Sequence, residues 1–526
     1  MQYYFKSKLL ISITFFLIGF CKAGLPESSH NSFHANPLPH RPLGESGRGQ
    51  RDSSRNQFST KILDAAQMRQ ELDFLEKKLK DVHPEPFHFL TEVEFNNRLS
   101  GLRNNLPQSM TREKWYLELA RLIASLHDGH SAVFYADEFR KEYFQQGGTI
   151  MPFRIFLQDD FSVQIQDNFS ADSLLDSARL LEINGKPVDE LIGEMRKLTF
   201  GESDVFRNAQ VSWYFGRMYW FLYGHTDSLR VRLLLNNGSL AERKLPMLSD
   251  KEYEEVIRKK YPQVQATAKW RNMVYTPMQG RSVGRLSLMD FNLYKGFKDS
   301  VRAVFKTIAE NKTDTLLLDL RGNGGGEFNI TEEINHYLLD TPWVLVSKAK
   351  VKMSDEFYAA FPKALKILKF LPKKLIIRLA SALMTRNTRI RKTELSRDAY
   401  TRIPTYQIYT KPRKHFSRDY FFRGKVFLFT DRHSYSMSGM FAAIMKDYGR
   451  AVLVGEETGG LANPHGATTR LKLPVSGFSF SVSTARAYRP SGVFDDSGVK
   501  PDVPVAYEKL SKARTTEQML ELIRGK

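Results

Sequence analysis

The sequence predicts a fold built from both α-helices and β-strands, divided into three parts with different patterns. Apolar residues recur at helical spacing in residues 68–82 and 112–126. Short strand-like runs, one of them followed by an Asn-Gly turn signal, fill residues 144–246. Beyond residue 283, short apolar runs alternate with segments of helical periodicity. We therefore expect an N-terminal helical region, a β-rich middle part and a mixed α/β core.

Length and composition describe a globular protein with an unusual charge. The chain has 526 residues, enough for several domains, and 42% of them are hydrophobic. The formal net charge of +20 raises the question of nucleic-acid binding. The sequence has no recognised nucleic-acid motif and carries an export signal, so we expect no nucleic-acid partner.

The N-terminus has the layout of a secretory signal peptide. Residues 1–23 combine two early lysines, an apolar run and small residues near Ala23. A signal anchor is one alternative, although the run is short for a membrane span. A lipidated Cys21 is another, although Phe20 suits a lipoprotein cleavage site poorly. Cleavage after Ala23 would remove the only cysteine, so the pattern predicts an exported, periplasmic or envelope-associated protein without disulfides.

A polar spacer separates the signal peptide from the first ordered region. Residues 24–60 are rich in Ser, Pro, His, Asn and Arg and lack apolar periodicity, which predicts a disordered linker. Region 61–140 is expected to be helical. Its helix at 112–126 has Thr111 in the capping place and stops just before His130. A histidine beyond a helix end is most often structural or exposed.

Residues 141–250 switch to a β-rich pattern. A strand, an Asn-Gly turn and a second short strand occupy residues 178–188, and a helix is expected at 189–198. A further strand follows at 228–235. The segment resembles the second half of a PDZ domain, which implies capture of an extended peptide end by strand addition. A plain β-rich insertion without a ligand remains the alternative.

Three serines stand between an apolar run and a helical pattern in the sequence SYSMSG at residues 434–439. Residues 426–430 predict a buried strand, and the apolar residues of 440–448 share one helical face. Such a strand-to-helix turn exposes a hydroxyl and free backbone N–H groups, as a nucleophile with an oxyanion site needs. The alternative is that the serines only cap the helix.

A second turn is rich in glycine. The predicted strand at 315–320 runs directly into RGNGGG at 321–326. So many glycines indicate unusual backbone angles or a close backbone approach. The Gly-Lys-Ser/Thr of a phosphate-binding loop is absent, which argues against a nucleotide. A flexible turn remains open.

Three ordered motifs carry a resemblance to a known family. The sequence SMSGMFAAIMK from Ser436, with GRAVLVGEETGG from Gly449, resembles the core of the tail-specific (C-terminal processing) serine peptidases. DLRGNGGG from Asp319 and GVKPD from Gly498 are similar to two further motifs of that family. The resemblance implies that residues 251–526 form a crotonase-like core of repeated β-β-α units, without a metal or cofactor.

The resemblance also implies site residues. Ser436 would be the nucleophile, and the N–H groups of Met437 and of Gly324 or Gly325 would form the oxyanion hole. The sequence LHDGHS at 126–131 is similar to a motif of the family's tricorn-core branch, where a histidine at this place is the general base. The base implied here is therefore His130.

Two positions set the expected branch. Leu461 stands where the Ser/Lys processing proteases carry their lysine, so the resemblance implies the Ser/His branch. Asp495 stands where that branch has an orienting glutamate, and it would hold the imidazole of His130. His465 is a reserve candidate for the base. The prediction is an exported serine endopeptidase acting on polypeptides; the alternative is an inactive relative that binds peptides or apolar ligands.

Residues 346–404 read as a basic insertion in the core. Between residues 348 and 398, fourteen lysines and arginines stand against four acidic residues. Leucines at spacings of three and four residues give residues 363–392 an apolar face. Such a segment could contact an anionic membrane surface. The other interpretation is that its leucines pack on the protein, for example as a cover over a cleft. The sequence does not predict the oligomeric state.

Overall fold

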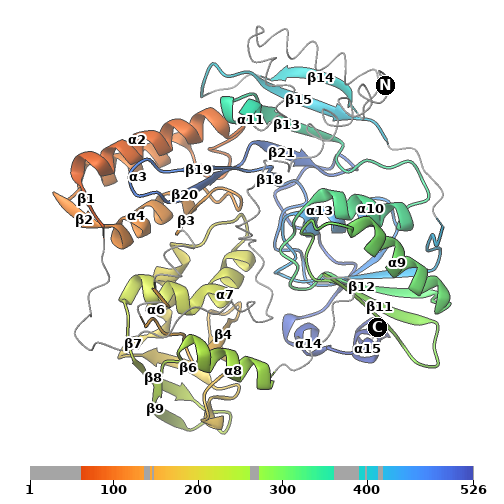
Figure 1. Ribbon diagram of the computed structural model, residues 1–526, viewed down its shortest axis with the longest axis horizontal. Helices are drawn as coiled ribbons and strands as arrows, with labels where there is room; N and C mark the ends of the chain where they lie inside the picture. The colour runs from red at the N-terminus through yellow and green to blue at the C-terminus, as the bar shows by residue number, and fades with distance from the viewer. Residues whose placement is uncertain are drawn as a thin grey trace.

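The computed structural model is mixed α/β and contains several sheets (Figure 1). It describes residues 61–135, 143–144, 147–260, 272–359, 390–396, 400–412 and 419–524. The expected signal peptide at 1–23 and linker at 24–60 lie outside these ranges. No helix within the described ranges combines the length and the apolar character that crossing a bilayer requires.

The N-terminal part is helical, as the periodicity predicts. It comprises β1 (Ile62–Asp64), α2 (Ala65–Val82), α3 (Glu92–Asn104), β2 (Ser109–Thr111), α4 (Arg112–Ala124) and β3 (Ala132–Phe134). Thr111 caps α4, because its side chain accepts a hydrogen bond from the Lys114 N–H. The apolar faces of α2 and α4 pack against Phe478 and Phe480. Phe480 belongs to β20 (Ser479–Val482), which pairs with β3 and with β19 (Thr469–Lys472). The helical part is therefore tied to the C-terminal part of the chain.

The middle part is a β-rich unit with the strand order β4-β5-β6-β8-β9 and with β7 paired to β6. Its elements are β4 (Phe153–Leu157), β5 (Val163–Asn168), β6 (Arg179–Ile183), β7 (Lys186–Pro187), α6 (Val188–Arg196), α7 (Asp204–Tyr223), β8 (Ser228–Leu234), β9 (Leu240–Pro246) and α8 (Asp250–Lys260). Asn184 and Gly185 have φ values of 50° and 78°, as the predicted turn requires. Along the edge strand β4, the Leu157 N–H donates to Ser212 Oγ of α7 at 2.9 Å.

The core sheet has the order β10-β11-β12-β16-β17-β22. Its strands are β10 (Met273–Pro277), β11 (Val283–Leu288), β12 (Thr315–Asp319), β16 (Lys425–Thr430), β17 (Val452–Gly455) and β22 (Val503–Pro504). β10 pairs antiparallel to β11, and every other neighbouring pair is parallel. Because parallel strands are covered on both faces, they form near-continuous apolar runs such as the buried leucines of β12.

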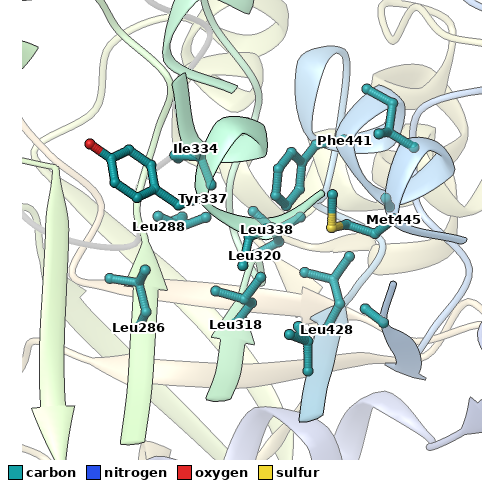
Figure 2. Close-up of a cluster of buried hydrophobic side chains, with 14 of the residues drawn as sticks. Leu286, Leu288, Leu318, Leu320, Ile334, Tyr337, Leu338, Leu428, Phe441 and Met445 are labelled. Carbon is teal, nitrogen blue, oxygen red and sulfur yellow. The ribbon is translucent and has the colours of Figure 1, made fainter. Parts of the chain in front are cut away.

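Helices cover both faces of this sheet. α9 (Phe297–Glu310), α10 (Phe328–Leu338) and α13 (Met437–Asp447) pack on one face, where Leu318 and Leu428 meet Phe441 (Figure 2). α14 (Tyr507–Lys512) and α15 (Thr516–Arg524) pack on the other face, against Leu317 and Phe429. Alternate residues of one strand thus serve two cores, and the carboxyl ends of β12 and β16 are fixed between them.

Strands at and beside the ends of the predicted basic insertion belong to a sheet that they share with the C-terminal part of the chain. β13 (Lys348–Lys352), β14 (Ile390–Ser396) and β15 (Thr405–Thr410) join β21 (Ala485–Tyr488) and β18 (His465–Gly466) in one sheet with the order β14-β15-β13-β21-β18. A short helix, α11 (Asp355–Ala359), follows β13. Residues 360–389, which contain the leucines and lysines of the membrane hypothesis, lie outside the described residues.

Candidate active site

Ser436 occupies a strained turn between a strand and a helix. β16 ends at Thr430, and α13 begins at Met437 with Ser436 in the N-cap place. Its φ of 54° and ψ of −118° are unusual for a residue with a side chain, and such strain is found at functional sites. The Ser436 side chain makes no capping hydrogen bond, so the interpretation of Ser436 as a simple helix cap does not hold.

Hydrogen bonds from the glycine-rich turn hold the nucleophile turn in place. The Tyr435 N–H donates to the Asn323 carbonyl, and Ser434 Oγ donates to the carbonyl of Leu320. The Asp431 carboxylate accepts the N–H of Gly322. Because both turns follow neighbouring parallel strands, the sheet brings the two predicted motifs together at one edge.

His130 lies against Ser436, although 306 residues separate them in the chain. His130 Nε2 and Ser436 Oγ are 2.8 Å apart. Burial lowers the pKa of His130 below its ordinary value, and the nearby Asp128 charge opposes that effect without cancelling it. A neutral imidazole at this distance can accept the serine proton.

Asp128 supplies a buried negative charge beside the base. One carboxylate oxygen accepts the His130 backbone N–H at 2.9 Å, and the other accepts from His83 Nε2 at 2.9 Å and from the hydroxyls of Ser131 and Ser483. Burial acts to raise the pKa of Asp128, but the hydrogen bond from His83 and the electrostatic effect of His83, His465 and His130 together outweigh it and hold that pKa well below its usual range. The sequence pattern predicts only that a helix stops just before His130 and attaches no role to Asp128, although its carboxylate stands two positions before the base.

Tyr435 and Glu202 complete the surroundings of His130. The Tyr435 hydroxyl lies 3.2 Å from His130 Nδ1. Glu202, just before α7, is partly exposed as a residue, but its Oε2 is buried and has no hydrogen-bond partner in the described part of the chain. Burial and the Asp128 charge raise the pKa of Glu202 to about 8. No pattern in the sequence marks Glu202, and the interpretation of 434–439 attended to its serines rather than to Tyr435.

The predicted oxyanion glycines approach the nucleophile closely. A Cβ placed on Gly325 would lie 2.8 Å from the Met437 nitrogen and 2.8 Å from Ser436 Cβ, and Gly325 has a φ of +103°. The Gly325 N–H itself donates to Asn323 Oδ1 at 2.9 Å. As the first residue of α13, Met437 has an N–H without an acceptor in its helix. Of the two glycines, Gly324 is the one whose N–H has no partner among the described residues.

The structure does not bring Asp495 to His130. Its Oδ1 accepts from the N–H and the hydroxyl of Ser497, and no contact in the described part of the chain joins it to the imidazole. The chain turns at Ser497, and the short aspartate side chain closes that turn instead of reaching the base. The orienting role expected of Asp495 is therefore not supported by the geometry.

Neither His465, the other candidate for the base, nor Leu461, which stands at the lysine position of the Ser/Lys proteases, provides a proton acceptor for Ser436 in the described structure. His465 is buried, with its Nε2 3.3 Å from Glu85 Oε2, and it does not contact Ser436 in the described structure. Burial lowers the pKa of His465 to about 4, so it is neutral at pH 7. Leu461 is buried and bridges to Gly498. It offers no proton acceptor to the serine.

Two groups of side chains in the described residues have the spacing of a metal site: His83, Asp128 and His465, and Asp128, His130 and Glu202. Asp128, which both share, already accepts hydrogen bonds on both carboxylate oxygens. His83 Nδ1 accepts the Glu85 N–H, so its proton stays on Nε2, which faces Asp128. The first group is thus satisfied by the protein's own hydrogen bonds, and it fits an ion poorly.

The segment that contains Ser436 is similar to a known protein family. Residues 282–505 match the model of peptidase family S41. This S41 segment includes Ser436, both glycines of the oxyanion prediction and Asp495, whereas His130 and Glu202 precede it. The match supports the resemblance to C-terminal processing peptidases, and with it a serine-type hydrolase.

Solved structures support the fold. Mature CPAF complexed with lactacystin is 16% identical, with a TM-score of 0.57 over 88% of this chain and 99% of that chain. The photosystem II D1 C-terminal processing protease is 14% identical, with a TM-score of 0.43 over 84% of this chain and 94% of that one. The likeness to CPAF supports the arrangement of the fold as a whole, and the second score is too low to add to it. No curated protein matches the sequence.

Proposed function

We propose that this protein is a serine endopeptidase in which Ser436 is the nucleophile and His130 is the general base. The observation that carries the proposal is the 2.8 Å separation of Ser436 Oγ from the Nε2 of a partly buried histidine whose pKa is lowered. As Oγ attacks the carbonyl carbon of a peptide bond, its proton passes to Nε2. The same proton then leaves with the amine, and water hydrolyses the acyl-enzyme by the reverse route.

The groups around Ser436 and His130 can stabilise the two charges that develop in this reaction, the oxyanion and the imidazolium. The N–H groups of Met437 and Gly324 are the donors for the oxyanion. Asp128 is the carboxylate that stabilises the imidazolium, in place of the expected Asp495, since it is ionised, buried and bonded to the His130 backbone. With Leu461 in the lysine's place, the proposal favours the Ser/His branch of the family over the Ser/Lys branch.

The place of action follows from the sequence. The signal-like pattern at 1–23 supports export, and envelope or periplasmic polypeptides are then the substrates within reach. The rival function is an inactive relative that binds peptides on its β-rich unit. One observation weakens that rival: the Leu157 N–H on the edge strand β4 already donates to Ser212 Oγ, so it is not free for strand addition.

Labelling with a fluorophosphonate probe tests the proposal. Wild-type protein should be labelled on Ser436 and should hydrolyse a casein substrate, whereas Ser436→Ala should do neither. Ser438→Ala is the matched control, because its hydroxyl is buried without a hydrogen-bond partner and two residues away. Ser434→Ala is a poorer control, since it loses the bond to the Leu320 carbonyl and about 1 kcal/mol of stability.

Two results would separate the candidates. Labelling and hydrolysis that persist unchanged in Ser436→Ala would place the nucleophile elsewhere. A folded wild-type protein that is never labelled and cleaves nothing would favour the binding protein. Lactacystin, which the CPAF structure holds, is a second probe for the same serine.

A further inference from the structure

We propose that the Tyr435 hydroxyl is the positioning group of the catalytic histidine, and that it holds His130 in the tautomer that can receive the Ser436 proton. The inference rests on the proposed peptidase function and goes beyond it. It places the orienting group on the nucleophile turn itself rather than on the aspartate near the C-terminal motif.

The neutral His130 ring carries one hydrogen, and a hydrogen on Nδ1 needs an acceptor. Nε2 faces Ser436 Oγ and must accept its proton, so Nδ1 must carry the hydrogen of the neutral ring. The group facing Nδ1 is the Tyr435 hydroxyl, at 3.2 Å. Its oxygen accepts the Nδ1–H, which fixes both the tautomer and the rotation of the ring. Burial, with the charges of Glu202 and Asp128, raises the pKa of Tyr435 well above its ordinary value, so the group stays a neutral phenol.

Asp128 cannot take this place, although it is the nearest ionised carboxylate. Its Oδ1 accepts the backbone N–H of His130, and its Oδ2 accepts from His83, Ser131 and Ser483. The two tasks that one carboxylate performs in a Ser-His-Asp triad are therefore divided here. Asp128 supplies the charge and holds the backbone, while Tyr435 meets the ring nitrogen.

The tyrosine is held where this role needs it. Its ring stacks on Phe206 of α7, with centroids 4.0 Å apart and planes inclined by 2°. Its hydroxyl lies over Gly129, where a Cβ would come within 1.7 Å of the oxygen. Glycine at position 129 thus leaves the space into which the hydroxyl reaches, directly beside the imidazole.

Glu202 borders the space that the phenol hydroxyl occupies. Since the tyrosine oxygen accepts from Nδ1, its own O–H points away from the imidazole, toward the side where Glu202 Oε2 is buried without a hydrogen-bond partner among the described residues. The Cβ position of Gly129 lies 1.7 Å from the tyrosine oxygen and 3.1 Å from Glu202 Oε2, so both atoms border the same small space. The chain of contacts then runs from Ser436 through His130 to Tyr435, whose ring packs on Phe206 of α7.

The test is Tyr435→Phe, which keeps the aromatic stack and removes the oxygen. We expect kcat and the rate of fluorophosphonate labelling to fall about 10- to 100-fold, less than for loss of the base itself, with KM unchanged. Tyr448→Phe is the matched control, since it also removes a tyrosine hydroxyl with a hydrogen bond, here a half-buried one whose oxygen accepts the Val344 N–H. It should leave kcat unchanged.

A double-mutant cycle separates positioning from structural support. In a His130→Ala background, Tyr435→Phe should cause no further loss of labelling, because the hydroxyl acts through the imidazole. An equal fractional loss in both backgrounds would mean that the hydroxyl only supports the turn, and it would overturn the proposal. Full kcat in Tyr435→Phe would overturn it as well.

A measurement on the wild-type protein covers the case in which Tyr435→Phe does not fold. The histidine ¹⁵N resonances that disappear in His130→Ala report the tautomer of His130 directly. The Nδ1–H form is expected, and the Nε2–H form would contradict the inference. These outcomes differ from a failure of the proposed function, in which wild-type protein shows neither labelling nor hydrolysis.

Discussion

The ring of Phe206 lies flat on the ring of Tyr435, with centroids 4.0 Å apart. A second stack joins the same helix to the same turn, since Trp213 covers His433 at 4.3 Å. In the same turn, Arg432 forms an ion pair with Asp159 of the β-rich unit. Contacts from outside the S41 segment thus stabilise the turn that presents Ser436. The shape of the active site therefore depends on how the β-rich unit packs against this turn.

Removal of the Phe206 ring should lower both the stability and the activity of the protein. Phe206 is 3% exposed, so Phe206→Ala leaves a cavity and should cost about 3–5 kcal/mol in the free energy of unfolding. We also expect kcat to fall, because Tyr435 loses the surface that positions it. Val205→Ala, at a 38% exposed neighbour on the same helix, is the control and should cost less than about 0.5 kcal/mol. Urea unfolding and steady-state kinetics check both; unchanged kcat in Phe206→Ala would show that the turn keeps its shape alone.

Gly325→Ala should block the oxyanion site. The new Cβ would lie 2.8 Å from the Met437 nitrogen, where the oxyanion is expected, so kcat should fall by about 10²–10³. Gly477→Ala is the control for backbone strain, because Gly477 has a similar positive φ of +76° and no atom within 4 Å of the added Cβ. Both variants should lose stability, but Gly477→Ala should keep its kcat. Equal kcat values for the two variants would argue against the oxyanion assignment.

The pH dependence of hydrolysis should reflect a lowered histidine pKa. Activity needs neutral His130, whose ordinary pKa is about 6.5. Burial lowers that pKa, and the groups that face the ring are Asp128, Glu202, Tyr435 and Ser436. The kcat/KM value should therefore rise with pH through an inflection below about 6.5 and stay level near neutrality. Asp128→Asn removes the charge that opposes the shift, so its inflection should move to still lower pH. An inflection above pH 7 would refute this account.

Glu202 should make the protein less stable as the pH rises. Its pKa is about 8 in the folded protein, against about 4.3 for an unfolded chain, so between these values the unfolded state gives up a proton that the folded state keeps. The free energy of unfolding must then fall with rising pH over that window and level off above pH 8. Glu202→Gln removes this dependence, and its gain in Tm over wild type should grow from pH 5 to pH 8.

Thermal unfolding at pH 5, 6.5, 8 and 9 measures that gain. Glu521→Gln, at an exposed position on α15, provides the control and should shift Tm by the same amount at every pH. A pH-independent difference between Glu202→Gln and wild type would show that Glu202 is ionised in the folded protein.

Local sequence patterns determined the helices and strands, and the motifs that follow two of the strands identified Ser436 and the glycine-rich turn. The periodicity in residues 68–82 and the cap at Thr111 depend on neighbours three or four positions away, so α2 and α4 appear where predicted. The apolar runs of β12 and β16 were likewise readable, and the motifs after them named Ser436 and the glycine turn. Family resemblance, rather than any local pattern, singled out His130.

Tertiary packing decided which groups surround that histidine. Asp495 and Asp128 look equally able to orient an imidazole in the sequence, and Glu202 resembles any acid before a helix. The structure separates them, because the helical region, the β-rich unit and the S41 segment meet at His130, and each brings at least one side chain to it. Contacts between residues 128, 202 and 435 depend on how these three parts of the chain pack, and no periodicity or spacing along the chain encodes that packing.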